Sequence, residues 1–230
     1  MNKLIQKIFS YIRQKIFNFL YKIQLKRRNH FLNKQRELLK NKDFTLIANN
    51  CNGGVLSHEL GLRFNSPLVN LFINTEDYVK YLKNFDYYNS LTLSFVTDDT
   101  KSYPIGKLDD VTIDFVHYKS NEEAEQKWEE RKKRINKNNM FIIFTEQNDC
   151  TEQCLKDFDN LPFEKKVVFT YKKHDNIKSA VFVKKYENSH DGVTMFLDFE
   201  DRFSIRRNYD CFDFITWFNG EKNLNKLMRE

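Results

Sequence analysis

Short runs of apolar residues alternate with polar segments along most of the chain. Continuous apolar runs of about four to eight residues, bounded by turn-forming residues, are typical of strands buried on both faces of a sheet. Runs of this kind occupy residues 44–48, 68–73, 91–96, 140–145, 166–171 and 179–183. Residues 111–117 alternate apolar and polar side chains, which predicts a half-exposed strand, with a short strand near 103–105 before it.

Helix signals lie between these runs. Ser120 followed three residues later by Glu123 is a capping box, which predicts a helix to about residue 136. Thr75 is predicted to cap a helix that runs to about residue 85. Further helices are expected after residue 55, at 152–158 and, with an aromatic face that closes the core, at 209–217. Strands and helices in this order predict an α/β fold: a mixed, mainly parallel sheet flanked by helices, in a single domain at residues 43–225.

The first 42 residues have a different pattern. Apolar side chains recur at helical spacing from Ile5 to Ile23 and cover about 120° of a helical wheel, with lysines and arginines outside or beside this stripe. The charges disfavour a spanning helix, and no cleavage site indicates a signal peptide. We therefore expect an N-terminal amphipathic basic helix in residues 1–42. We expect this helix to lie in a membrane interface. The alternatives are that it packs on the body or on a second copy, or that it contacts nucleic acid.

Charge is divided unequally between this arm and the rest of the chain. The net charge is +6, but residues 1–42 hold 12 Lys/Arg and one acid, whereas residues 43–230 hold 26 Lys/Arg and 31 acids. The arm, with its cluster Lys26-Arg27-Arg28, indicates an anionic membrane surface as the partner of residues 1–40. The acidic body without a base-stacking motif argues against nucleic acid. Four cysteines without a secretory signal indicate reduced thiols, so we expect a cytoplasmic protein, peripheral at the inner face of the cell membrane.

The main candidate site is the loop after the first strand. Ligands of α/β proteins bind outside the carboxyl ends of strands, and glycines there let backbone N–H groups approach a phosphate at a helix start. We predict that Asn49, Asn50, Gly53 and Gly54 bind substrate. Cys51 is a candidate nucleophile, because a helix N-terminus lowers the pKa of a thiol. The motif is neither a P-loop nor a dinucleotide fingerprint, so a capped turn with a packed, apolar Cys51 is the alternative.

Two further strand ends carry polar side chains. His117 and Tyr118 end one strand, and Asp149 follows another. If these strands run parallel to the first, their side chains converge on the loop. His117 is then a candidate general base, Asp149 a catalytic residue that orients it or binds a substrate hydroxyl, and Tyr118 a substrate-binding residue. The alternative is a surface histidine and a helix-capping aspartate. Cys150-x-x-x-Cys154 lacks the second ligand pair of a zinc site, so we expect no metal and no cofactor.

The chain also resembles a known bacterial family in motifs spread over about residues 40 to 220. The matching stretches are 44–54, 66–72, 110–120, 123–131 with 134–136, and 168–172 before 177–180. These motifs are similar to those of the domain-of-unknown-function family numbered nineteen-nineteen, whose members are often labelled exopolysaccharide biosynthesis proteins. The resemblance implies an α/β fold and a link to capsule or exopolysaccharide production, and supplies no catalytic residues. Asn52 departs from the bulkier residue that members commonly place there.

Together these observations predict a membrane-surface protein of cell-surface polysaccharide (exopolysaccharide or capsule) biosynthesis. In the first hypothesis the protein is a transferase that acts on a phosphate-bearing sugar donor. The Asn49 to Gly54 loop holds the donor phosphate, His117 or Asp149 handles the acceptor hydroxyl, and a nucleotide sugar or a lipid-linked glycan is the ligand. In the alternative it is a non-catalytic adaptor that docks on the membrane-bound polysaccharide synthesis machinery through the arm and the aromatic tail.

Overall fold

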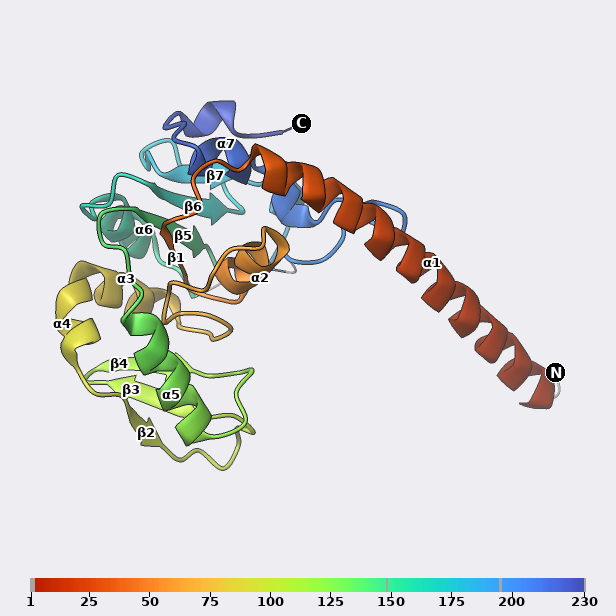
Figure 1. Ribbon diagram of the computed structural model, residues 1–230, viewed down its shortest axis with the longest axis horizontal. Coiled ribbons are helices and arrows are strands. Elements are labelled where there is room, and N and C mark those ends of the chain that lie inside the picture. Colours follow the sequence, from red (N-terminus) through yellow and green to blue (C-terminus); the bar gives the residue numbers. More distant parts are fainter. Residues whose placement is uncertain (1–2, 148, 195, 230) are drawn as a thin grey trace.

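The computed structural model describes residues 3–147, 149–194 and 196–229. The body is built on a four-stranded parallel sheet in the order β1-β5-β6-β7 (Figure 1). The strands are β1 (Thr45–Ala48), β5 (Met140–Thr145), β6 (Lys166–Thr170) and β7 (Ala180–Phe182). Their apolar runs are buried on both faces, as the sequence pattern predicts, and the α/β fold with parallel strands is confirmed. The spatial order follows the chain order, so the described sheet has no point at which the winding reverses.

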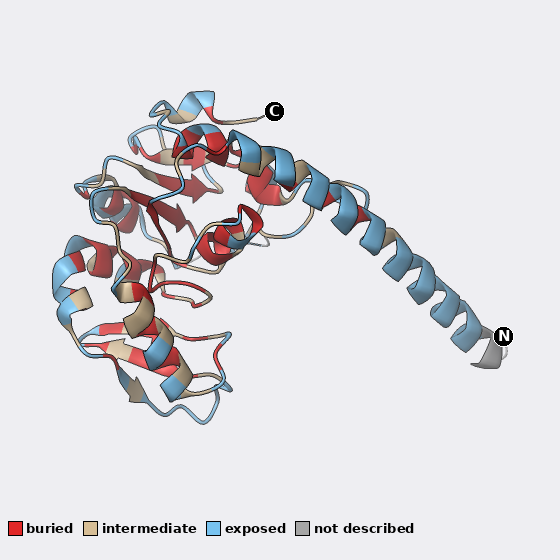
Figure 2. Cartoon of the chain, viewed as in Figure 1, coloured by how far each residue is buried: buried red, intermediate tan, exposed pale blue. Residues whose placement is uncertain are grey.

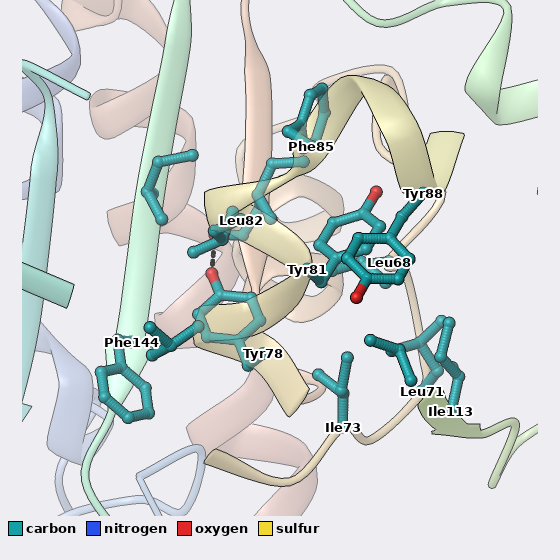
Figure 3. Packing of buried hydrophobic residues seen from close by; sticks show 14 of the residues in the cluster. Leu68, Leu71, Ile73, Tyr78, Tyr81, Leu82, Phe85, Tyr88, Ile113 and Phe144 are labelled. Atoms are coloured by element: carbon teal, nitrogen blue, oxygen red, sulfur yellow. Dashed lines mark hydrogen bonds between the residues drawn. The ribbon is translucent and has the colours of Figure 1, made fainter. Parts of the chain in front are cut away.

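Helices cover both faces of this sheet. One face packs against α3 (Thr75–Lys83), α4 (Phe85–Ser90), α5 (Asn121–Lys132) and α6 (Glu152–Asp159). Tyr78 of α3 is fully buried there, and its hydroxyl donates to the carbonyl of Ile143 at 2.8 Å and lies 3.2 Å from that of Ile47 (Figure 3). This side chain therefore ties α3 to two adjacent strands.

The other face packs against α2 (Asn52–Glu59) and the aromatic tail. The tail holds a 3-10 turn at Asn208–Cys211 and the short helix α7 (Phe214–Phe218), not one continuous helix over 209–217. Phe141 of β5 lies edge-on to Trp217 and Phe218, with ring centroids 4.9 and 5.0 Å apart. The tail closes this half of the core, as predicted, and further 3-10 turns occupy Lys184–Tyr186 and Leu224–Lys226.

A second, antiparallel sheet is inserted between α4 and α5. It consists of β2 (Ser94–Val96), β3 (Ile105–Leu108) and β4 (Val111–Asp114) in chain order. Residues 68–73, predicted to be a strand, contribute only the isolated bridge between Phe72 and Asp114. The segment is buried, but Asn70 has a φ of 59°, which interrupts an extended backbone. The apolar run therefore marks a buried irregular segment.

Two predicted helix starts differ in detail from the structure. Ser120 caps α5 as expected, because its hydroxyl accepts from the Glu123 N–H. The Glu123 carboxylate, however, accepts from the N–H of Lys119 and not from that of Ser120, as a capping box requires. Asn74, and not Thr75, caps α3: its side-chain oxygen accepts from the Asp77 N–H at 2.8 Å.

The N-terminal helix α1 (Lys3–Leu38) extends away from the body as a single rod (Figure 1). Most of its length is exposed, whereas the sheet is buried (Figure 2). Its C-terminal part packs on the body through Gln24, Arg28, Leu32 and the following Leu39. Across the described residues, no helix combines the length and the apolar character needed to cross a bilayer.

Candidate functional site

The loop after β1 is held against the end of β5 by side-chain amides. Asn49 is fully buried, and its amide group accepts from the Thr145 N–H at 3.1 Å and donates to the Thr145 carbonyl at 3.2 Å. Asn52 donates to the Thr145 hydroxyl at 3.0 Å. Asn49 therefore acts as a substitute for backbone groups and continues the pairing of β1 with β5 beyond the strands, while Asn52 binds the Thr145 side chain.

Asn50 and the two glycines also have partners inside the loop. The side-chain oxygen of Asn50 accepts from the Asn52 N–H at 3.0 Å and so closes a turn. A Cβ on Gly53 would lie 3.0 Å from the Cβ of Ala48, and one on Gly54 would lie 2.5 Å from the side-chain oxygen of Asn70. The glycines thus permit close packing of α2. A substrate-binding role for these residues stays a prediction.

Cys51 precedes α2, but its thiol does not have the expected electrostatics. Its sulfur lies 3.9 Å from the carbonyl of Leu71 and the residue is half-buried. Burial raises the pKa of the Cys51 thiol above its ordinary value, the opposite of the lowering expected at a helix start. The neutral thiol is therefore favoured, which agrees with the packed, apolar alternative.

The strand that leads to His117 and Tyr118 belongs to the antiparallel sheet. It pairs with β3 and with no strand of the parallel sheet, so the premise that its end meets the end of β1 at one edge of one sheet does not hold. His117 is exposed, and among the described residues no hydrogen bond or ion pair joins it to Asp149. Tyr118 is buried; its hydroxyl donates to the Val69 carbonyl at 2.6 Å and accepts from Arg131. Tyr118 thus holds the segment before Asn70 in place.

Asp149 does lie beside the loop. One oxygen of its carboxylate accepts from the Thr75 hydroxyl at 3.0 Å, at the start of α3. The preceding Ile73 donates its N–H to the Asn49 carbonyl at 3.0 Å, so Asp149 and the β1 end share one edge of the sheet. The structure therefore places Asp149 at the edge where β1 ends, and among the described residues it has no hydrogen bond or ion pair with His117.

A buried carboxyl that sequence reasoning missed lies at the same edge. Glu146, 3% exposed, directly follows β5, and one oxygen accepts from the Tyr171 N–H at 3.0 Å. The Nε2 atom of His174 lies 3.3 Å from its other oxygen. Burial raises the pKa of Glu146. The sequence signal for it was an acid directly after the most apolar strand.

The two cysteines near this edge are not arranged as a metal site. Cys150 precedes α6, while Cys154 is buried within it with its sulfur 3.5 Å from the Thr75 carbonyl. The neighbouring thiol of Cys154, together with burial, raises the pKa of Cys150. In the described part of the chain, no group of three or more His, Cys, Asp or Glu side chains could hold a metal ion.

A group of buried ion pairs, which we call the anchor, holds α1 on the body through Arg28, Glu59, Arg207 and Asp210. Arg28, 2% exposed, donates to Glu59 of α2 at 2.5 Å and forms a shorter contact with Asp210. Arg207 adds a 2.8 Å ion pair to Glu59, and Tyr209 donates its hydroxyl to the same carboxylate. Arg28 therefore faces the body, although the run Lys26-Arg27-Arg28 was predicted to face anionic lipid.

Comparison with known proteins places these features in context. A family model described as a domain of unknown function (DUF1919) matches residues 22–219. An uncharacterized protein of Haemophilus influenzae is 41% identical over 196 residues, which cover 84% of this chain and 93% of that relative. The family match begins just before Gln24 and Arg28, the first α1 residues buried against the body.

Proposed function

This chain belongs to the family of the domain of unknown function DUF1919, and we propose that it acts at a membrane surface in the synthesis of cell-surface polysaccharide. The process is the one that the family resemblance implies, and the place of action is argued from α1. The observation that carries the proposal is a largely exposed apolar stripe on α1.

The stripe consists of large apolar side chains in the first two thirds of α1. Its exposed members are Ile8, Phe9, Ile12, Ile16, Phe19 and Ile23, with exposed fractions from 40% to 66%. Ile5, which the sequence pattern also assigns to it, lies outside the described side chains. An apolar row of this length on one helix face is typical of helices that lie in a membrane interface.

The anchor fixes the direction in which this stripe faces. At about 100° per residue, the stripe is centred near Ile16, whereas the residues buried against the body, from Gln24 to Leu39, lie roughly 140° around the helix. Since α1 is continuous, docking of its C-terminal part turns most of the stripe away from the body, and one edge of the stripe faces Arg202 of the loop after β7. The alternative that the stripe packs on the body of the same chain is therefore disfavoured.

Neighbouring groups suit a membrane surface. Arg13 and Lys15 flank the stripe and are exposed, and each cation near an acidic leaflet adds about 1 kcal/mol. Phe203, 66% exposed, lies on a loop that Gln24 holds through the carbonyls of residues 201 and 204. A further exposed aromatic side chain, besides Phe9 and Phe19 of the stripe, thus lies on a segment attached to α1.

The contacts of the predicted loop favour the adaptor role over group transfer. Asn49, Asn50 and Asn52 use their amides within the protein, and Gly53 and Gly54 accommodate close packing. In this proposal the arm holds the body at the membrane, where it docks on the synthesis machinery. Transfer from a nucleotide sugar to a lipid-linked acceptor remains the second candidate, and ligand-induced thermal stabilisation by nucleotide sugars tests it.

Vesicle flotation of the full-length protein tests membrane binding. We expect binding to vesicles with anionic lipid that weakens with salt, and loss of binding in the double variant Ile12→Asn/Ile16→Asn. Tyr11→Asn is the matched control, since Tyr11 is 62% exposed but lies off the stripe. Equal flotation of the double variant and the control would contradict the proposal. So would a wild-type dimer that the double variant converts to a monomer in light scattering.

Glycan production in cells separates the two roles. The adaptor role predicts that Ile12→Asn/Ile16→Asn abolishes cell-surface polysaccharide in a complemented deletion strain, while Cys51→Ala, His117→Ala and Asp149→Ala leave it intact. Loss of glycan in any of these three alanine variants, at normal protein levels, would support the transferase instead.

A further inference from the structure

The antiparallel sheet has one covered edge and one free edge. On β4, Asp114 exchanges two backbone hydrogen bonds of 2.8 Å with Phe72, and the Asp77 carboxylate accepts from the Thr112 N–H at 2.9 Å. On the other side, among the described residues, no backbone group outside β3 pairs with β2. This strand lies at the end of the body opposite to α7 (Figure 1). An unpaired strand can accept a further strand from another chain.

The register shows which backbone groups face the free edge. Asp114 directs its N–H and carbonyl toward Phe72, so its partner Ile105 directs the same groups toward Val96 of β2. Hydrogen-bonded and non-hydrogen-bonded pairs alternate along antiparallel strands, so Phe95 directs its N–H and carbonyl away from β3. The centre of the edge therefore offers one donor and one acceptor to a neighbouring strand.

The loop that follows β2 does not cover this edge. Lys101 and Tyr103 turn toward Asp114 of β4, with the Lys101 Nζ atom 3.4 Å and the Tyr103 hydroxyl 3.5 Å from its carboxylate. Since β4 lies on the far side of β3, the loop leans away from β2. Residues 96–102 are exposed, and β2 itself is exposed or half-buried (Figure 2).

Two exposed apolar side chains lie beside the free edge. Outside α1, the described chain exposes three large apolar side chains, and two of them are Tyr87 and Val96. Val96 is 43% exposed and belongs to β2. Tyr87, 49% exposed, lies near the amino end of β2, because its hydroxyl donates at 2.8 Å to Asp109 in the turn between β3 and β4. A strand with apolar side chains can pack against both.

Charge indicates the kind of strand that fits. Residues 85–118, which hold α4 and the antiparallel sheet, contain six aspartates and two lysines, so their net charge is −4. Asp98 and Asp99 follow β2, and Asp109 lies at its other end; all three are exposed. Among the described residues, no cation lies within ion-pair distance of these carboxylates. They would repel a second copy of the same edge and attract lysine or arginine.

We propose that the free edge of β2 binds an extended segment of a partner protein in which lysine or arginine alternates with apolar residues. Backbone pairing supplies the binding, and the charges at both ends of the edge select a basic segment. The inference deepens the adaptor role, and its choice of partner rests on the proposed function. Cytoplasmic segments of membrane proteins carry an excess of lysine and arginine, so a membrane-bound synthesis component has the required chemistry.

Peptide binding to the full-length protein in solution tests the site. The probe is a fluorescent seven-residue peptide that alternates lysine with valine. A second peptide has proline in place of the central valine, which keeps the charge but removes a backbone donor, and a third has glutamate in place of lysine. We expect only the first to bind in fluorescence anisotropy, with an affinity that falls as salt rises. Hydrogen exchange of the Phe95 amide, followed by NMR, should become slower because that N–H is paired in the complex.

Two variants locate the binding surface. Val96→Lys places a cation in the strand, and we expect affinity for the alternating peptide to fall about tenfold or more. Asp98→Asn/Asp99→Asn removes two of the attracting charges and should also weaken binding about tenfold. Both changes are at exposed side chains, so the fold should persist, which circular dichroism checks.

Matched controls make the same changes away from the antiparallel sheet. Phe203→Lys replaces another exposed apolar residue, and Asp175→Asn/Asp191→Asn removes two other exposed acids. Unchanged affinity in these controls, with weaker binding in the β2 variants, supports the proposal. Absence of binding by the alternating peptide overturns it, and so does equal binding of the proline peptide, which would show charge attraction without strand pairing.

Two further measurements separate this inference from its alternatives. A wild-type dimer that Val96→Lys converts to a monomer in light scattering would show that a second copy covers the edge, and would overturn the proposal. Vesicle flotation of Val96→Lys should equal that of the wild type, because the stripe on α1 is unchanged. Failure of peptide binding therefore leaves membrane binding standing, and failure of flotation leaves the β2 site standing.

Discussion

Arg28 of α1 and Glu59 of α2 form a buried ion pair, with 2.5 Å between Nη2 and Oε2 and side-chain exposures of 3% and 9%. Burial works against the charge of Glu59, but hydrogen bonds from Arg28 and Tyr209 outweigh it and hold its pKa below the ordinary value. This pair joins the arm to the body and sets the direction of the apolar stripe.

Replacement of Arg28 should therefore destabilise the protein strongly. Arg28→Met leaves Glu59 and Asp210 buried without their cation, and we expect a loss of about 3–5 kcal/mol in the free energy of unfolding. Urea denaturation measures it. Arg27→Met is the control: Arg27 is exposed, and we expect a change within about 0.5 kcal/mol. Equal stability of the two variants would show that the arm is held by other contacts.

The sequence pattern concealed this role of Arg28. It stands in a run of three cations, Lys26-Arg27-Arg28, and such a run is usually a solvated face. The acids that bind it, Glu59 and Asp210, are distant along the chain, and only the folded structure brings them together. The spacing of Gln24, Arg28 and Leu32 on one helix face was the one local signal.

The packing role of Gly54 leads to a second prediction. Gly54→Ala places a Cβ 2.5 Å from the side-chain oxygen of Asn70, and we expect a loss of about 1–3 kcal/mol in unfolding free energy. Adding Asn70→Gly removes that oxygen and suits the φ of 59° at this position, so it should restore part of the stability. Thermal denaturation of both variants measures the effect. No recovery in the double variant would mean that the steric explanation is wrong.

The parallel sheet was predictable because its strands are continuous apolar runs, a pattern that burial on both faces requires. Residues 68–73 show the limit of that argument: Leu68, Leu71 and Ile73 are as buried as strand residues, yet Asn70 interrupts the extended backbone. The site was harder to predict, since the argument for His117 depends on which sheet β4 joins, which the sequence pattern leaves open.

Cys51 provides a third prediction. Because burial raises the pKa of its thiol, little thiolate forms near neutral pH. We therefore expect iodoacetamide at pH 8 to react with Cys51 at least about tenfold more slowly than it reacts with the thiol of glutathione. Mass spectrometry of the Cys51 peptide over time measures the rate. In urea the same peptide should react at the rate of a free thiol, which is the internal control. A native rate faster than that of glutathione would restore the nucleophile hypothesis.

Glu146 provides a fourth prediction, on pH dependence. Burial raises the pKa of Glu146 in the folded state above that in the unfolded chain, even though His174 and Lys172 attract its charge. The protonated form therefore stabilises the fold below the unfolded pKa, near 4.3, and this contribution is lost as the pH rises through the folded pKa. Glu146→Gln keeps an acceptor for the Tyr171 N–H and cannot ionise. Its stability relative to wild type should rise with pH above about 4, by about 1.4 kcal/mol for each unit by which the two pKa values differ.

Urea denaturation of both proteins at several pH values between about 4 and 7 measures this difference. Glu187→Gln is the control, because Glu187 is exposed and its difference from wild type should stay flat across the range. A difference for Glu146→Gln that falls with rising pH would mean that the attraction of His174 outweighs burial. In that case Glu146 is held as a charged partner of His174 at the edge of the sheet.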